Sequence, residues 1–151
     1  MGVVDRLVAF GALTELERRF FMVAWLAAGP SALAIATLGY RRTEALLAMM
    51  PSPGSRKDAL GVDAERGEQL VRKAFHWSPA RWSTREGGCL PRAVAQYAAH
   101  RWMGDDVALC LGVSRPKTAE AKAFDAHAWV EDAGAPPREQ GHAPIYRFRG
   151  G

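Results

Sequence analysis

The feature that most constrains this chain is an uncharged, largely apolar run, FFMVAWLAAGPSALAIATLGY, at positions 20–40. A run of this length can cross a bilayer, and otherwise it must be buried against protein. Gly29-Pro30-Ser31 lies in its middle, and proline lacks the amide hydrogen that a helix interior needs. The run therefore predicts two helices separated by a break.

The predicted break favours packed helices over a membrane span. A capping box at Thr14 and Glu17 predicts a first helix that ends near Ala28, and Ser31 can begin a second helix. Arginine pairs flank the run on both sides, so charge gives it no orientation in a membrane. We expect helices that face a core or a partner, followed by a short third helix at 43–50.

Composition points to a globular protein without a nucleic-acid partner. Of the 151 residues, 48% are hydrophobic and 24% are charged, which is enough apolar material for a core. The formal charge of +4 comes from scattered arginines and not from the basic cluster that nucleic acid requires. The sequence opens without a secretory signal, which predicts a cytoplasmic protein with reduced thiols. Its cysteines and histidines lack ligand spacing, so we expect no metal and no cofactor.

A change in composition predicts two parts of the chain. The stretch PSPGSRKDALG at 51–61 has the residues of a loop and is the best candidate boundary. It separates an N-terminal helical segment, 1–55, from a second domain, 56–151. We expect the first part to dock a partner and the second part to carry the chemistry.

The order of elements in the second part predicts an α+β fold with a small antiparallel sheet. Helices are expected at 62–77 and from about Leu90 to Met103, with Gly104 past the end. Three consecutive strands should follow, and prolines weaken the last of them to an edge strand. Their expected positions are 106–115, 123–131 and 136–146.

Cys89 is the first candidate for chemistry. It follows Gly87 and Gly88 and directly precedes a predicted helix, where backbone amides and the helix dipole favour a thiolate. The glycines let a substrate approach closely, and the Cys89 amide can help to hold an oxyanion. A cysteine at a helix start can equally be a small packed residue, so this position alone does not decide.

His127 is the candidate base, because it lies in an apolar strand, AHAWV, where each ring nitrogen needs a partner. A thiol on one side and an acid on the other would make a nucleophile pair with an orienting group. The alternative is a core histidine bonded to backbone. The other three histidines, His76, His100 and His142, are expected at the surface.

The orienting acid can be ranked from strand geometry. If the strand around His127 forms a hairpin with the next strand, His127 lies opposite Glu139 on the same face. Asp125 shares that face but is displaced along its strand, whereas Asp132 points to the opposite face. This ranks Glu139 first, Asp125 second and Asp132 third. A register slip of one residue would favour Gln140.

The sequence also allows predictions for three further residues. Cys110 lies in the apolar run VALCLGV and is expected to be an inert, buried thiol. Arg92, three residues after Cys89, either binds a substrate carboxylate or carbonyl or solvates the surface. Trp129 shares the face of His127 and either forms a wall of the site or belongs to the core.

Four segments together resemble a known family. They are CLPRA at 89–93, a helix that ends in RWMG, an apolar strand that ends in LGV at 111–113, and AHAWVE at 126–131. In combination they look like the transglutaminase-like leader peptidases of lasso-peptide biosynthesis, which are similar to the C-terminal domain of the microcin-processing protein. The resemblance covers about residues 62–146 and, more loosely, the helical N-terminus.

The resemblance implies a transglutaminase or papain-like core, in which a Cys-bearing helix packs on a small antiparallel sheet. A Cys-His-Asp triad then cuts the leader from a ribosomally made precursor. Cys89 matches the nucleophile and His127 the general base, but the position of the family's aspartate holds Glu139, which is a departure from the pattern. Implied partners are the leader peptide, a separate leader-recognition protein and an ATP-dependent cyclase that closes the ring afterwards.

Two other functions stay open from the sequence. A transglutaminase-like acyl transferase would use the same three residues and pass the acyl group to an amine instead of water. A non-catalytic peptide-binding module would keep Cys89 and His127 only as packed residues.

Overall fold

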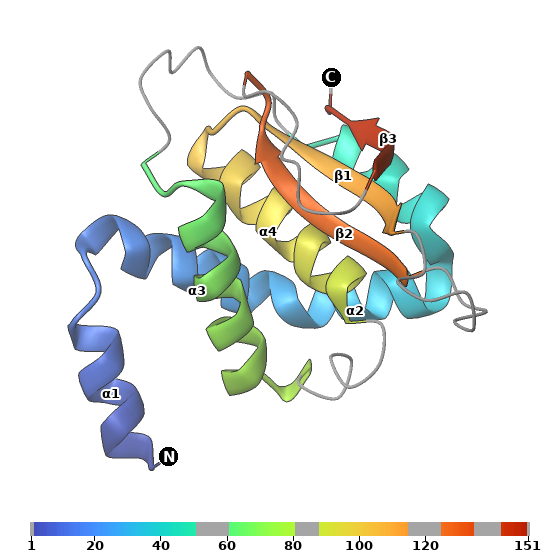
Figure 1. The fold of residues 1–151 in the computed structure, drawn as a ribbon. Coiled ribbons are helices and arrows are strands. Elements are labelled where there is room, and N and C mark those ends of the chain that lie inside the picture. Colours follow the sequence, from blue (N-terminus) through green and yellow to red (C-terminus); the bar gives the residue numbers. More distant parts are fainter. Residues whose placement is uncertain (1, 51–60, 81–87, 115–124, 135–142, 151) are drawn as a thin grey trace.

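The computed structural model describes residues 2–50, 61–80, 88–114, 125–134 and 143–150 (Figure 1). Within these ranges the protein consists of helices followed by an antiparallel three-stranded sheet, which confirms the predicted α+β class. The helices are α1 (Val3–Gly11), α2 (Glu15–Ala48), α3 (Ala64–Trp77) and α4 (Cys89–Met103). The strands are β1 (Val107–Ser114), β2 (Asp125–Asp132) and β3 (Ala143–Phe148).

Helix α4 lies at the centre of the fold, with the sheet on one side and helices α2 and α3 on the other (Figure 1). Its alanines Ala95 and Ala99 belong to a core cluster with apolar residues of α2 and α3. Its residues Ala93, Val94 and Tyr97 belong to a second cluster with the strands. The N-terminal helical segment and the second predicted part therefore share one core.

Helix α2 begins as the sequence predicts but does not break where it predicts. The Thr14 hydroxyl accepts a hydrogen bond from the Glu17 amide at 3.2 Å, and the Glu17 carboxylate accepts one from the Thr14 amide at 2.8 Å. The helix then continues through Pro30, so the expected end near Ala28 is wrong. The deviation from helical geometry comes instead at Gly39, with φ 72° and ψ 173°.

The position of each residue explains this difference. Gly29 and Pro30 lie on the exposed side of α2, as does Leu26, the residue four before the proline. Proline has no amide hydrogen to bond to the carbonyl of Leu26, and because this carbonyl lies on the exposed side, water can bind it instead. A positive φ is costly for residues with a Cβ atom, so the bend falls on Gly39. The expected short third helix at 43–50 is the last part of α2.

The sheet has the order β2-β1-β3, with both outer strands antiparallel to β1. The sequence placed β2 beside the next strand in a hairpin, and this pairing is wrong. His127 lies opposite Gly112 of β1, and β3 pairs with the other edge of β1. The edge position of β3 is as expected, although the strand begins at Ala143, later than the predicted start.

The two faces of β2 have different neighbours. Ala128 and Val130 pack in the core cluster that contains α4. Trp129 packs in a small cluster with Ala108 and Cys110 on the other face. Because side chains alternate along a strand, His127 shares the face of Trp129 and not the face toward α4.

His100 is fully buried in α4, so its expected place at the surface is wrong. Two-sided packing of α4 leaves no solvent face at this position. The ring satisfies one nitrogen through the Asp105 carboxylate, which lies 2.8 Å from Nδ1, and the Phe20 ring packs edge-on at 4.6 Å. His76, by contrast, is exposed, and His142 lies outside the described residues.

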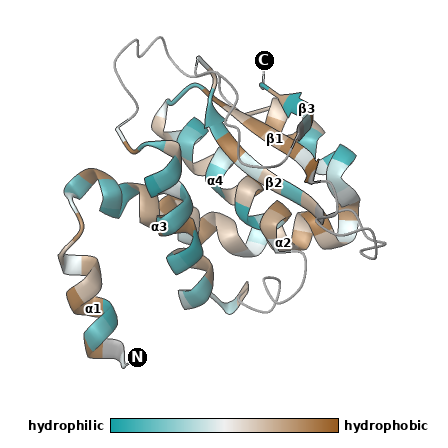
Figure 2. Ribbon diagram, in the orientation of Figure 1, coloured by the Kyte–Doolittle hydropathy of each residue, from teal (hydrophilic) through white to brown (hydrophobic). Residues whose placement is uncertain are grey.

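Helix α1 lies within the helical segment expected at 1–55, although its own bounds were not predicted. It extends away from the rest of the molecule (Figure 1) and mixes apolar with polar positions along its length (Figure 2). Its inner residue Phe10 packs edge-on against Phe21 of α2, whereas Val4, Leu7 and Val8 are exposed.

Helix α2 is also the one described helix that is long and apolar enough to cross a membrane, judged by length and composition. Core helices of soluble proteins pass the same test. In its most apolar window 28% of the residues are buried within the protein, and Phe20, Ala24 and Ala28 belong to the core.

Replacing Gly67 should destabilise the fold, because α3 lies too close to α4 there for an added Cβ atom. A Cβ atom at Gly67 would lie 2.8 Å from His100 Nε2 and 3.1 Å from Gln96 Nε2. We expect Gly67→Ala to lower the free energy of unfolding by about 1–3 kcal/mol, as for other overpacked cores. The matched control is Gly11→Ala in α1, where an added Cβ meets nothing within 4 Å. Urea unfolding measures both, and equal stability of the two variants would contradict the close approach.

Candidate functional site

Cys89 is the first residue of α4, directly after the N-cap residue Gly88, as the sequence predicts. Its side chain is partly buried and forms no disulfide. The thiol donates to the Ala126 carbonyl of β2, with 3.8 Å between Sγ and O. The thiol therefore lies beside the backbone that immediately precedes His127.

The N-terminal end of α4 favours a negative charge. The first turn contains no acidic residue, and Gly88 supplies no side-chain cap. Arg92 adds a cation within the first turn. Helix amides and the helix dipole give such an end a positive electrostatic potential. The site of Cys89 is suited to hold either a thiolate or a developing oxyanion.

His127 lies near the start of β2 and is partly buried. Its ring stacks on the Trp129 indole, with 6.0 Å between ring centroids and 16° between ring planes. The two predicted catalytic residues are thus at the same end of the sheet. The thiol lies on the α4 side of β2, and the imidazole on the Trp129 side.

The three candidate acids have different placements. Glu139 and the register alternative Gln140 lie outside the described residues. Asp125 is the first residue of β2, next to Ala126, with its backbone opposite Ser114 of β1. Asp132 is the last residue of β2, and its carboxylate accepts a hydrogen bond from the Gly134 amide at 3.0 Å.

Strand geometry separates Asp132 from the site. Asp132 is five residues after His127 along β2, which at about 3.3 Å per residue is about 16 Å. Among the described strands, β2 and β3 do not pair with each other, because each pairs with β1, so the hairpin used to rank Glu139 first is not the observed pairing. However, β3 begins at Ala143, beside Val113 of β1, and the other neighbour of Val113 is Ala126. The strand that follows Glu139 therefore starts at the same end of the sheet as His127.

The two residues predicted to bind substrate differ in exposure. Arg92 is partly exposed on α4, one turn from Cys89. Trp129 is only 6% exposed and packs against Ala108 and Cys110. Its contact with His127 places the indole behind the imidazole, where it supports that ring.

Glu131 is a residue of this region that the sequence reasoning missed. It is 2% exposed, and its Oε1 atom accepts a hydrogen bond from the Trp129 indole N–H at 2.8 Å. Its Oε2 atom lies 3.5 Å from Cys110 Sγ and 4.0 Å from Arg147 Nη2. The available signal was the spacing H-x-W-x-E, which puts His127, Trp129 and Glu131 on one face of a strand.

Cys110 is buried in β1 as expected. Burial and, after it, the nearby Glu131 carboxylate together raise the pKa of its thiol to about 12. A thiol with such a pKa is protonated at neutral pH and is not a nucleophile. The structure thus leaves Cys89 as the cysteine with access to solvent.

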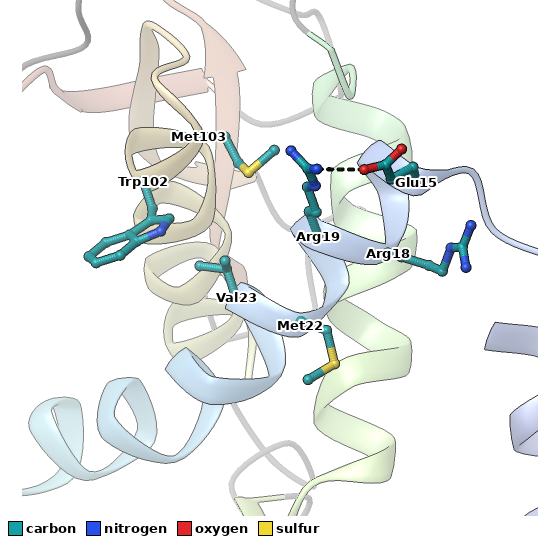
Figure 3. Close-up of a pocket in the computed structure, with 7 residues that line it drawn as sticks. All are labelled: Glu15, Arg18, Arg19, Met22, Val23, Trp102 and Met103. Atoms are coloured by element: carbon teal, nitrogen blue, oxygen red, sulfur yellow. Dashed lines mark hydrogen bonds and ion pairs between the residues drawn. The ribbon is translucent and has the colours of Figure 1, made fainter. Parts of the chain in front are cut away.

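The described ranges contain no cluster of three Cys, His, Asp or Glu side chains that could hold a metal ion. They do contain an open groove of about 860 Å³ between α2 and the C-terminal end of α4 (Figure 3). Trp102 is exposed on one side of this groove, and Arg19 bonds with Glu15 on the other. The lining residues are Glu15, Arg18, Arg19, Met22, Val23, Trp102 and Met103.

The environments of the two cysteines predict selective alkylation. Iodoacetamide at pH 8 should modify Cys89 and leave Cys110 unmodified in the folded protein, because the Cys110 thiol is buried and protonated. Peptide mass spectrometry identifies the modified residue. Modification of both cysteines in guanidinium chloride is the control. Equal labelling of both in the folded protein would contradict the described burial.

Comparison with known proteins agrees with the overall architecture. No curated protein and no solved structure matches the chain. A sequence model of the transglutaminase-like superfamily matches residues 24–149, which include most of α2, all of α3 and α4, and the sheet. This superfamily contains cysteine proteases and acyltransferases. The chain therefore belongs to the transglutaminase-like superfamily.

Proposed function

We propose that this protein is a cysteine endopeptidase that removes the leader peptide from a ribosomally made lasso-peptide precursor, before a separate cyclase closes the ring. The observation that carries the proposal is the position of Cys89. Its thiol lies at the N-terminal end of a buried helix, 3.8 Å from the carbonyl that precedes His127. Membership of a superfamily with cysteine proteases supports the same chemistry.

In the proposed mechanism His127 takes the proton of the Cys89 thiol. The thiolate attacks the carbonyl carbon between leader and core, and the imidazolium gives its proton to the departing amine as the C–N bond breaks. Water, deprotonated by the imidazole, then attacks the thioester and releases the leader carboxylate. Because β2 is an edge strand of the described sheet, we propose that the proton passes around this edge, between the thiol at the Ala126 carbonyl and the imidazole that stays stacked on Trp129.

Glu139 is the proposed orienting acid, although glutamate replaces the family's aspartate. The start of β3 at Ala143 supports this assignment, because that strand begins at the His127 end of the sheet. The alternatives Asp125 and Asp132 keep their lower ranks. Asp132 is the weaker of the two, since it lies at the far end of β2 and bonds to the Gly134 amide.

The N-terminal helices are the proposed docking region for the leader or its recognition protein. The groove between α2 and α4 supports this role, since its lining includes the exposed apolar side chains of Trp102 and Met22 together with Arg18 (Figure 3). Aromatic and arginine side chains are enriched in protein interfaces. We place the protein in the cytoplasm, where it would act with a leader-recognition protein and an ATP-dependent cyclase.

Acyl transfer is the second candidate, because the superfamily also contains acyltransferases. The thioester on Cys89 would then pass to an amine and not to water. Mass spectrometry of the product separates the two outcomes, since hydrolysis leaves a leader with a free carboxylate and transfer leaves an amide.

Replacing the nucleophile should abolish cleavage. In a mixture of precursor peptide, leader-recognition protein and enzyme, Cys89→Ala should release no free leader, because no thioester can form. Mass spectrometry detects the released leader. Cys110→Ala is the matched control and should retain cleavage. Undiminished cleavage by Cys89→Ala would end the endopeptidase proposal and leave the peptide-binding module.

Replacing the orienting acid should slow cleavage without abolishing it. Glu139→Gln is expected to lower kcat by about 10²–10⁴-fold, since a misoriented imidazole is a poor base. Asp132→Asn should leave kcat within about threefold, because its position is about 16 Å from His127 along the strand. Steady-state kinetics on the same precursor compares them with Asp125→Asn. A larger loss in Asp125→Asn would move the role to that residue.

A further inference from the structure

We infer that Glu131 is a positioning residue, which fixes the His127 imidazole by holding the Trp129 indole in place. This inference rests on the proposed function only for the role of His127 as a base. The arrangement itself consists of three residues at alternate positions of β2, joined by one hydrogen bond and one ring stack.

The geometry connects the three side chains in order. The Glu131 carboxylate accepts the indole N–H of Trp129 at 2.8 Å. The indole in turn stacks on His127 with ring planes only 16° apart. A hydrogen bond to a charged acceptor fixes the indole rotamer, and a fixed indole restricts the orientation of the ring that stacks on it.

An ion pair with Arg147 does not explain the position of Glu131. The closest Arg147 nitrogen lies 4.0 Å from the carboxylate, and the Arg147 guanidinium donates instead to the carbonyls of Asp132 and Ala133, each at 3.2 Å. The bond to the Trp129 indole is much shorter. Of these three distances from the carboxylate, to Trp129, Cys110 and Arg147, the shortest is to the residue that supports His127.

The burial of Glu131 also requires an explanation. A carboxylate that is 2% exposed has lost most of its hydration, and a buried charge persists where specific hydrogen bonds replace water. Glutamine would fill the same volume and could still accept the indole hydrogen bond, but more weakly, because its oxygen is uncharged. The charge of Glu131, and not its shape, is the property that the arrangement needs.

The test uses two spectroscopic signals and one chemical probe. Nuclear magnetic resonance gives the Trp129 indole N–H signal, assigned by its loss in Trp129→Phe, and the His127 ring protons, assigned by their loss in His127→Ala. In the native protein the stacked indole should shift the His127 ring protons upfield. In Glu131→Gln the indole N–H signal should move upfield and exchange faster with solvent, and the His127 ring protons should lose part of their ring-current shift.

The chemical probe is the rate at which iodoacetamide modifies Cys89 at pH 7. We expect His127→Ala to lower this rate most, and Glu131→Gln to lower it by about tenfold, since a mispositioned base assists the thiol poorly. Trp129→Phe keeps an aromatic ring but removes the donor. In that background Glu131→Gln should cause no further loss, because the two residues act through one bond.

The matched control is Arg147→Gln, which removes the other charged neighbour of Glu131 and leaves the indole bond in place. Its thermal stability should fall, while the His127 ring-proton shifts and the alkylation rate stay at native values. Additive losses in the Glu131→Gln, Trp129→Phe double variant would overturn the inference. So would unchanged His127 ring-proton shifts in a folded Glu131→Gln protein.

Failure of this inference is distinguishable from failure of the proposed function. If Glu131→Gln leaves both signals unchanged while Cys89→Ala still abolishes cleavage, only the positioning role is wrong. If His127→Ala leaves Cys89 alkylation and precursor cleavage at native rates, His127 is not the base, and the endopeptidase mechanism fails as well.

Discussion

Two-sided burial of α4 is the constraint on which the other parts of this structure depend. The helix packs its alanines against α2 and α3 and its larger residues against the sheet. Such packing requires a close approach at Gly67 and forces His100 into the interior, where Asp105 must satisfy it. A helix held on both sides cannot roll about its axis. The N-terminal residue Cys89 therefore has a fixed direction relative to β2.

Predictions from the sequence succeeded where a residue and its immediate neighbours determine the structure. The capping box at Thr14, the left-handed Gly104 after α4 and the apolar strand β1 all follow from local patterns. The predicted strand pairing was wrong, because β2 and β3 both pair with β1 and residues of all three strands pack in the core cluster that contains α4, which no local sequence pattern indicates. The break at Pro30 failed for a similar reason, since its cost depends on which side of α2 meets water.

For the candidate site, too, the predictions succeeded for local signals and failed where burial in the fold decides. The place of Cys89 at a helix start was predictable, because a glycine pair before a helical pattern is a local signal. The role inferred for Glu131 was not, since a glutamate near a strand end is ordinarily a surface residue. Only the fold shows that this carboxylate is buried and points at the Trp129 indole. Glu139 lies outside the described residues, so its assignment still rests on the resemblance and on where β3 begins.

The groove and the thiol lie at opposite ends of α4, and this separation sets a length. Trp102 is thirteen residues after Cys89 in the helix, a distance of about 20 Å at 1.5 Å per residue. An extended peptide covers about 3.4 Å per residue. A substrate anchored at Trp102 would therefore need about six residues between its anchor and the bond at Cys89. In that arrangement the length of α4 would help to determine which bond is cut, because it sets the distance between the anchor and Cys89. The side chains next to the bond would then not be the only source of specificity.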